Sequence, residues 1–453
     1  MKDSHISTGN IPLNEYFQPQ SIKNHFIKSA LGSFLIKIGT IFLSFISAII
    51  LARILGVQGF GVYSFCFSIV QLLTVPAMLG LQIYAVREVS NYRSHGQWEY
   101  MKGFLYRGTQ GILMASIFLG IISLIIAYYL ANYVDALSLS AFSVALLLLP
   151  LTSLTQFQEA ILRGLNYIIL GQMSRVICPG ISIILVGGCF FFLSEMLTPS
   201  IVLGIRAMAM SFSLILLYIL LRKKISSRIA KIRTSFETKK WVLSAWPMLL
   251  ASSMWIVNSE VSLVMLGALS KAENVGLYRV AQRGSEIVFF GLLAVNITIA
   301  PTISTLYYNK KMDLLQQIIT KCSRFILVYA FPTALSLILT SQWLVPLVFG
   351  LDFSSAALPL SILCSGQLFN AFIGPVSIVL NMTENEKLTA KGVTISTLIN
   401  IILNILLIPI WGVTGAALAT SISLVIWNIL LSVWLFQRLG LTTLPFRMQF
   451  LNT

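Results

Sequence analysis

Charged side chains are scarce in this sequence of 453 residues. Asp, Glu, Lys and Arg together make up 10% of it, while apolar residues make up 57%. An ordinary globular domain carries roughly 25% charged residues, because a soluble surface depends on them. The shortage therefore excludes a soluble enzyme and a disordered scaffold. It predicts an integral membrane protein whose apolar surface faces lipid.

Residues that bind metals or form disulfides are also few. The five cysteines lie in or beside apolar runs without any CxxC pair, and the three histidines lie in polar segments. We therefore expect neither a His/Cys metal centre nor any cofactor. The 15 acidic residues are outnumbered by 31 basic ones. Because the basic residues cluster between apolar runs, they indicate membrane topology signals, and we expect no nucleic-acid partner.

Long uninterrupted apolar runs are abundant, and they exclude a β-barrel, whose strands would alternate over about ten residues. A helix that crosses a bilayer needs about 20 apolar residues. The sequence therefore predicts an all-α integral membrane protein with twelve transmembrane helices. The predicted spans are residues 30–55, 59–81, 109–131, 137–158, 172–194, 199–221, 244–269, 279–303, 323–346, 356–380, 389–409 and 412–436.

The basic residues also predict how these spans are oriented. With the N-terminus in the cytoplasm, 25 Lys and Arg fall in cytoplasmic segments, and one, Lys271, falls on the opposite side. Cytoplasmic segments carry such an excess of positive charge, so we expect both termini in the cytoplasm. The most basic segment separates six spans from six. The predicted parts are a tail, an N-lobe, a basic linker, a C-lobe and a second tail, at residues 1–29, 30–221, 222–243, 244–436 and 437–453.

A short internal echo indicates that the two lobes are related. LGVQGFGVY (55–63) and LGALSKAENVGLY (266–278) both lie between the first and second helix of their half. Six spans per half give the two copies the same orientation. This implies a parallel repeat whose axis runs along the membrane normal.

Five basic residues fall inside or at the edge of predicted spans. An arginine there costs at least ~2.5 kcal/mol, so it usually faces a cavity or a partner. A guanidinium group also matches the oxygens of a phosphate. The candidate substrate-binding residues are therefore Lys37, Arg53, Arg206, Arg279 and Arg283.

Each of these cations has a structural alternative. Lys37 could extend to the cytoplasmic interface, and Arg53 could complement the dipole at the end of its helix. These two lie about 160° apart around a straight helix, so they cannot both face one cavity unless the helix bends. Arg206 could bind a partner on another helix. Arg283, which shares a helix face with Arg279, could pair with Glu286.

Two acids are candidate ion-coupling residues, Glu260 and Glu159. Glu260 has no basic residue within one helical turn, which suits binding of a proton or Na⁺, although Arg279 on another helix could be its partner. Glu159 could simply pair with Arg163 four residues later. We also expect the intramembrane Asn370, Asn400 and Asn404 to hydrogen-bond neighbouring helices.

Several motifs resemble the polysaccharide-repeat flippases of O-antigen and exopolysaccharide synthesis, a branch of the MATE-like MOP exporter superfamily. ARILGVQGFGVYSF (52–65) resembles their first-helix signature, and NVGLYRVAQR (274–283) resembles its second-lobe counterpart. EAILRGLN (159–166) is similar to the end of their fourth helix, and NIILNILLIPIWGVTGAALATSIS (400–423) to the passage between the last two helices. Family members often carry Asp in the seventh helix, where this chain has Glu260.

The resemblance implies two six-helix lobes around a central cavity lined by the first, second, seventh and eighth helices. It implies alternating-access transfer of an undecaprenyl-diphosphate-linked oligosaccharide across the bacterial plasma (inner) membrane, coupled to H⁺ or Na⁺. The expected partners are that lipid-linked substrate, the bilayer, a polysaccharide polymerase and a chain-length regulator. The protein would be a transporter in surface polysaccharide biosynthesis and not an enzyme.

Three alternative functions stay open at this point. A MATE-type multidrug exporter has the same fold but needs an acidic cavity, whereas the first three spans contain no Asp or Glu. A lipid-linked glycan polymerase or glycosyltransferase usually needs a large extramembrane loop or a carboxylate constellation, and neither is visible. A lipid II flippase usually has fourteen spans, against the twelve predicted here.

Overall fold

The computed structural model describes residues 19–446, apart from 131, 194–196 and 230–231. The ends of both predicted tails, residues 1–18 and 447–453, lie outside this range. The described part of the chain is built from helices and contains no strand, as the apolar runs predict.

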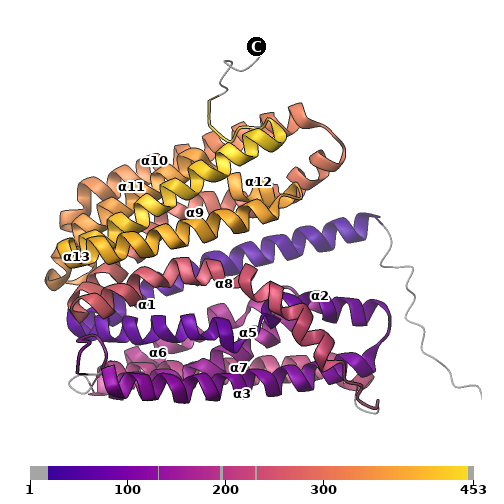
Figure 1. The fold of residues 1–453 in the computed structure, drawn as a ribbon, viewed down its shortest axis with the longest axis horizontal. Helices are drawn as coiled ribbons and strands as arrows, with labels where there is room; N and C mark the ends of the chain where they lie inside the picture. Colours follow the sequence, from indigo (N-terminus) through magenta and orange to yellow (C-terminus); the bar gives the residue numbers. More distant parts are fainter. Residues whose placement is uncertain (1–18, 131, 194–196, 230–231, 447–453) are drawn as a thin grey trace, which may run out of the picture.

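Seven α-helices and a short 3₁₀ helix form the first half of the chain, which fills the lower part of Figure 1. They are α1 (Pro19–Ala77), α2 (Leu81–Ser94), α3 (Trp98–Leu130), α4 (Leu139–Leu146), α5 (Leu148–Gly164), η2 (Leu170–Gln172), α6 (Ser174–Leu193) and α7 (Pro199–Ile229).

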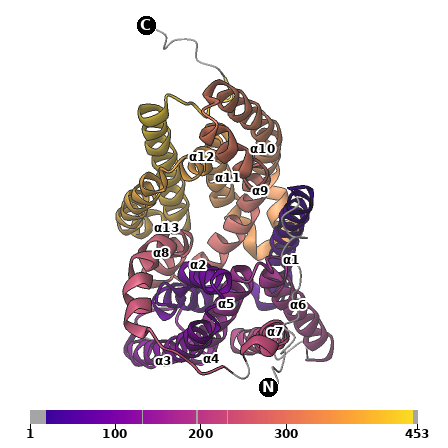
Figure 2. The ribbon, with the colours of Figure 1, turned by 90° about the vertical axis from the view of Figure 1, so that its right-hand side faces the viewer.

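Helix α8 (Thr238–Leu269) leads into the second half, which fills the upper part of Figure 1 and is seen from the side in Figure 2. The helices of this half are α9 (Ala272–Tyr308), α10 (Met312–Phe349), η4 (Leu351–Ala356), α11 (Ala357–Ile373), α12 (Val376–Met382) and α13 (Glu386–Leu439). We refer to α1–α7 as the N-lobe and to α8–α13 as the C-lobe. The predicted domain boundaries themselves stay a prediction.

Two helices, α1 and α13, are each bent back on themselves. In α1 the break lies at Gly56 (φ 65°, ψ −179°), and in α13 it lies at Gly412 (φ 54°, ψ −126°). Glycine adopts this positive φ without the penalty that a Cβ brings. Figure 1 shows both bends at the same end of the molecule, which we call the hairpin end.

Nine helices in the described part of the chain are long and apolar enough to cross a membrane. The protein is therefore a multi-pass membrane protein, as predicted. Two crossings for each bent helix, and one for α8, would bring the total to the predicted twelve, and this count stays a prediction. Within the predicted linker, residues 222–243, α7 continues to Ile229 and α8 begins at Thr238, so most of this segment is helical.

Large apolar side chains cover the outside of the helices. Met114, Ile184, Val328 and Leu339 are each at least 70% exposed. A soluble protein rarely exposes apolar surface on this scale, whereas hydrocarbon tolerates it. These side chains therefore belong to the lipid-facing surface that the composition predicts.

The two lobes meet most closely where the two echoing motifs lie. A Cβ on Gly61 of α1 would lie 1.8 Å from the backbone oxygen of Ala272, and a Cβ on Gly276 of α9 would lie 2.5 Å from that of Val57. Only glycine permits this approach of the two backbones. The internal echo predicted related lobes, and its two copies pack directly against each other.

Two polar contacts tie the lobes together at the hairpin end. Arg53 donates hydrogen bonds to the carbonyls of Leu347 (2.5 Å) and Val348 (2.8 Å), in the last turn of α10. Asp135, in the connection between α3 and α4, accepts a hydrogen bond from the backbone N–H of Ala272 (2.8 Å) at the start of α9. Each charge complements the helix end that it meets, so both contacts hold this end closed.

Candidate binding cavity

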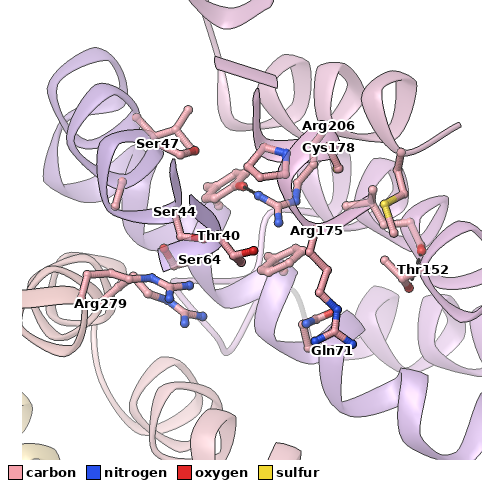
Figure 3. Close-up of a pocket in the computed structure, with 18 of the residues that line it drawn as sticks. Thr40, Ser44, Ser47, Ser64, Gln71, Thr152, Arg175, Cys178, Arg206 and Arg279 are labelled. Carbon is pink, nitrogen blue, oxygen red and sulfur yellow. Dashed lines mark hydrogen bonds between the residues drawn. The ribbon is translucent and has the colours of Figure 1, made fainter. Parts of the chain in front are cut away.

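A cavity of about 290 Å³ opens inside the N-lobe and reaches α9 of the C-lobe. Its walls come from both arms of α1 and from α5, α6, α7 and α9. Thr40, Ser44 and Ser47 recur at three- and four-residue spacing, so they form one polar face on the first arm of α1. Figure 3 shows these side chains between Arg279 on one side and Arg206 on the other. The resemblance predicted α1 and α9 as walls but not α5–α7.

Among the residues that the structure describes, five charged ones line the cavity, and four of them are basic: Glu159, Arg175, Arg206, Arg279 and Arg283. Three of the five predicted substrate-binding residues are therefore brought together here. The other two, Lys37 and Arg53, are not among its lining residues.

Arg279 is almost completely buried and ties three helices together. It donates a hydrogen bond to Glu260 Oε2 on α8 (2.9 Å), and others to Ser68 on α1 and to Gln282. The alternative partner of Glu260 is thereby confirmed, because Arg279 forms a salt bridge with it. Glu260 is thus not an unpaired carboxylate, and it is not among the residues that line the cavity.

Arg283 pairs within its own helix. Its Nη1 lies 2.9 Å from Glu286 Oε2 and 3.0 Å from Oε1. This is the local pair that the sequence offered as an alternative to substrate binding. Arg279 and Arg283 therefore share a helix face, but an acid holds each of them.

Glu159 has a different partner from the one predicted. Its carboxylate accepts hydrogen bonds from Ser174 and from Arg175, with Arg175 Nη2 at 3.1 Å, whereas Arg163 contacts only its backbone oxygen at 3.4 Å. The expected i,i+4 pair with Arg163 is therefore wrong. The short connection through η2 brings the start of α6 back beside α5, so residues 15 and 16 positions further on reach Glu159.

Arg206 on α7 lies over the aromatic side chains of α1. Its Nη1 donates a hydrogen bond to the hydroxyl of Tyr63 (2.9 Å), and its guanidinium carbon lies 4.1 Å from the ring centre of Phe67. The rings of Tyr63 and Phe67 are stacked on each other. A cation over an aromatic face is attracted by the ring, so this stack holds the guanidinium group in position.

The two remaining candidate cations differ in position. Lys37 precedes Thr40 by three residues and so extends the polar face of α1 one turn beyond the cavity, away from the hairpin end. Arg53 instead binds the end of α10 and lies outside the cavity. It complements a helix dipole as the alternative proposed, but the dipole belongs to α10 and not to its own helix. The two residues do not face one cavity, as their 160° separation predicts.

The C-lobe has a neutral polar network in the corresponding place. Asn404 donates hydrogen bonds to Ser262 (3.0 Å) and to Asn400 (2.9 Å), and Asn400 donates to Ser423 (3.1 Å). The expected role of Asn400 and Asn404 in joining helices is confirmed. Asn370 was expected to do the same, but it donates to Gln367 of its own helix.

Sequence reasoning missed Arg175 and Asp135. Arg175 was counted with the cytoplasmic charges, although its spacing to Cys178 and Ser182 is that of one helix face and indicates the cavity side of α6. Asp135 lies in a short polar segment between two spans. No local pattern indicates that its carboxylate meets the start of α9, 137 residues further along the chain.

Long apolar helices in two lobes, with a polar and mainly cationic cavity inside the N-lobe that reaches α9, define a membrane transporter of the MATE-like fold. Two solved structures share this fold. An inward-facing MATE multidrug resistance transporter of the MOP superfamily matches with a TM-score of 0.70 over 89% of this chain and 94% of its own, at 14% identity. The lipid II flippase MurJ, in an inward closed conformation, matches with a TM-score of 0.69 over 91% and 87%, at 18% identity.

The chain belongs to the polysaccharide biosynthesis protein family, whose model matches residues 26–307. A probable low-salt glycan biosynthesis flippase of Haloferax volcanii, Agl15, is 24% identical over 89% of this chain and 82% of its own. The probable flippase AglR of the same organism is 31% identical over 38% of this chain and 37% of its own. These relatives confirm the resemblance read from the motifs, and they make the protein a transporter and not an enzyme.

Proposed function

We propose that this protein moves an undecaprenyl-diphosphate-linked oligosaccharide from the inner to the outer leaflet of the bacterial plasma membrane, by alternating access. The observation that carries the proposal is the charge of the cavity. Its described lining has four arginines and a single acid, Glu159. A diphosphate stays negative during the whole crossing, and hydrocarbon cannot solvate it, so it needs a polar and cationic path.

The same charge argues against the drug-exporter alternative. An exporter of organic cations needs acids in its cavity, whereas here the four lining arginines exceed the one lining acid by three positive charges. The family match also supports a glycan function over drug export, and the flippase relatives support transport over a polymerase or glycosyltransferase. The likeness to MurJ is a likeness of fold, and it does not favour lipid II as the substrate.

The predicted residue roles are proposed in a revised form. Arg206 contacts substrate in the state described here, in which the hairpin end is closed and which we call the closed state. Arg279 and Arg283 contact it at a later stage, because their acids hold them in this state. Lys37, one turn beyond the cavity, meets the phosphates at the cytoplasmic entrance. We assign Arg53 to closing the hairpin end instead of to substrate binding.

Ion coupling is proposed to act through Glu260. Binding of H⁺ or Na⁺ to this carboxylate would break its pair with Arg279, which also bonds Ser68 across the lobes. The same event would loosen α9 from α8 and free a guanidinium group for phosphate. Glu159 is the second candidate, held by Arg175 in the same way.

The orientation places both termini in the cytoplasm and the hairpin end outside. Single cysteines in place of Lys224 and Lys271, both exposed positions, test it. An impermeant maleimide added to intact, outer-permeabilised cells should label position 271 and not position 224. The reverse pattern would contradict the orientation.

A deletion strain tests the function itself. Loss of the gene should abolish one surface polysaccharide, O-antigen or exopolysaccharide, while its undecaprenyl-diphosphate-linked unit accumulates in the inner leaflet. The polymerase and the chain-length regulator, which act on the unit after transfer, would then lack their substrate. Normal surface glycan together with altered drug tolerance would support the exporter alternative instead.

A further inference from the structure

Three of the four cavity arginines are neutralised by an acid. Arg175 lies 3.1 Å from Glu159, and two further pairs, Arg279–Glu260 and Arg283–Glu286, both measure 2.9 Å. The carboxylate of such a pair largely offsets the positive charge of the guanidinium group, so the pair attracts a further anion only weakly. The cationic character of the cavity in this state must therefore come from elsewhere.

Arg206 is the exception among the described residues. It is half-buried and has no carboxylate within salt-bridge distance, and its one hydrogen bond uses Nη1 alone. Its Nε and Nη2 donors have no hydrogen-bond partner in the described part of the protein. The stack of Phe67 and the hydroxyl of Tyr63 hold it in place without cancelling its charge.

The internal repeat shows that the N-lobe has a charge at this repeated position and the C-lobe does not. Tyr63 and Tyr278 each follow a close-contact glycine by two residues, Gly61 and Gly276. The hydroxyl of Tyr63 meets a cation on α7, whereas that of Tyr278 meets the hydroxyl of Thr420 on the second arm of α13 (2.7 Å). The corresponding position in the C-lobe is thus neutral.

A second polar group in the same cavity also lacks a partner. Ser64, one residue after Tyr63, is 1% exposed, and its Oγ has no hydrogen-bond partner among the described residues. It lines the cavity, and Figure 3 shows it between Arg279 and Arg206. A buried hydroxyl without a partner is costly, and a bound acceptor removes that cost.

From these observations we infer that Arg206 and Ser64 form the binding site of the substrate's diphosphate in the closed state, and we call this site the seat. The free Nε and Nη2 donors form a fork that matches two phosphate oxygens, and Ser64 supplies a hydroxyl donor. This assignment rests on the proposed function. It makes the N-lobe the carrier of the substrate's charge in this state, while the C-lobe arginines Arg279 and Arg283 stay paired with their acids.

Binding of farnesyl diphosphate to the purified full-length protein tests this seat, with farnesol as the uncharged control. Isothermal titration calorimetry should show that Arg206→Gln weakens binding at least about tenfold, because two charge-assisted hydrogen bonds are lost. Arg206→Lys should retain part of the affinity, since it keeps the charge without the fork. The control Lys271→Gln removes one positive charge at an exposed position outside the cavity and should change binding less than about threefold.

The outcomes distinguish failure of the seat at Arg206 from failure of the proposed function. Wild-type affinity in Arg206→Gln, with a monodisperse protein, would overturn the seat and leave the proposed function standing. A tenfold loss in Arg283→Gln alone would move the seat to α9. Failure of the wild type to bind farnesyl diphosphate would overturn the seat, whereas the proposed function fails only if the deletion strain keeps its surface glycan. Tyr63→Phe, which removes one hydroxyl under Arg206, provides a second test with little risk to folding and should weaken binding severalfold.

Discussion

Gly61 and Gly276 lie back to back at the junction of the two lobes. A Cβ on either residue would come within 3.2 Å of the other's backbone nitrogen. The two glycines occupy the same place in the two echoing motifs. Each glycine therefore contacts its own counterpart in the repeat. The proposed alternating access turns the two lobes against each other, and a bare backbone contact between these equivalent glycines is suited to persist during that motion.

The close contact predicts a large effect from a single methyl group. Gly61→Ala should separate α1 from α9, because the new Cβ would meet the backbone oxygen of Ala272 at 1.8 Å. Overpacking of this kind costs about 1–3 kcal/mol. A lower Tm in detergent, measured by fluorescence-detected gel filtration, checks it. Gly120→Ala is the control, since nothing lies within 4 Å of its Cβ, and an equal Tm loss in both variants would contradict the close contact at Gly61.

Glu260→Gln should slow transport and flatten its dependence on pH or sodium. The substitution removes the titratable group and leaves Arg279 buried without its acid. Removing one partner of a buried pair costs about 3–5 kcal/mol, so a lower Tm is expected too. The double variant Glu260→Gln with Arg279→Gln should recover stability but not pH dependence. If that double variant transports with normal pH dependence, and Glu159→Gln does not, then Glu159 is the coupling acid.

A charge swap separates the two roles of Arg283. Arg283→Glu combined with Glu286→Arg rebuilds the local pair on α9 but removes the cation from its place in the cavity. If Arg283 serves substrate at a later stage of transport, the swapped protein should insert normally and export little surface glycan. Full export by the swapped protein would show that the pair only stabilises the helix.

Arg53 and Asp135 should control access from the hairpin end. Arg53→Ala with Asp135→Asn removes both of these polar contacts between the lobes, so the outward-open state should become more populated. The native Cys178 lines the cavity and reports this. With the other four cysteines replaced, external labelling of Cys178 by an impermeant maleimide should rise severalfold. Lys271→Ala, an exposed cation at the same end, is the control, and equal labelling in all three proteins would count against a gate.

Much of the architecture follows from local properties of the sequence. Apolar runs, the scarcity of charge and the glycine motifs require no knowledge of distant residues, so the helices and the end of the first span near residue 55 could be predicted. The merging of two spans into α1 and into α13 was not predicted, because a single glycine can turn a helix without a visible loop. Cationic candidates such as Arg206 were found because a charge in a span is costly wherever it faces.

The pairing of charges was harder to predict, because it depends on tertiary contacts. The Arg283–Glu286 pair could be read locally, whereas Glu159 pairs with Arg175 through a turn whose geometry no spacing rule gives. Arg206 and Arg279 looked alike in the sequence. Only the fold shows that one meets an aromatic stack and the other meets an acid from the neighbouring helix.

Transfer of a glycan across a defined bilayer tests the central claim most directly. The purified protein is reconstituted with an undecaprenyl-diphosphate-linked oligosaccharide, and a glycosidase outside the vesicles reports how much glycan reaches the outer leaflet. We expect transfer to exceed that of protein-free vesicles and to fall at least about tenfold with Arg206→Gln. Vesicles that transfer no lipid-linked glycan under an ion gradient, yet accumulate a cationic dye, would contradict it.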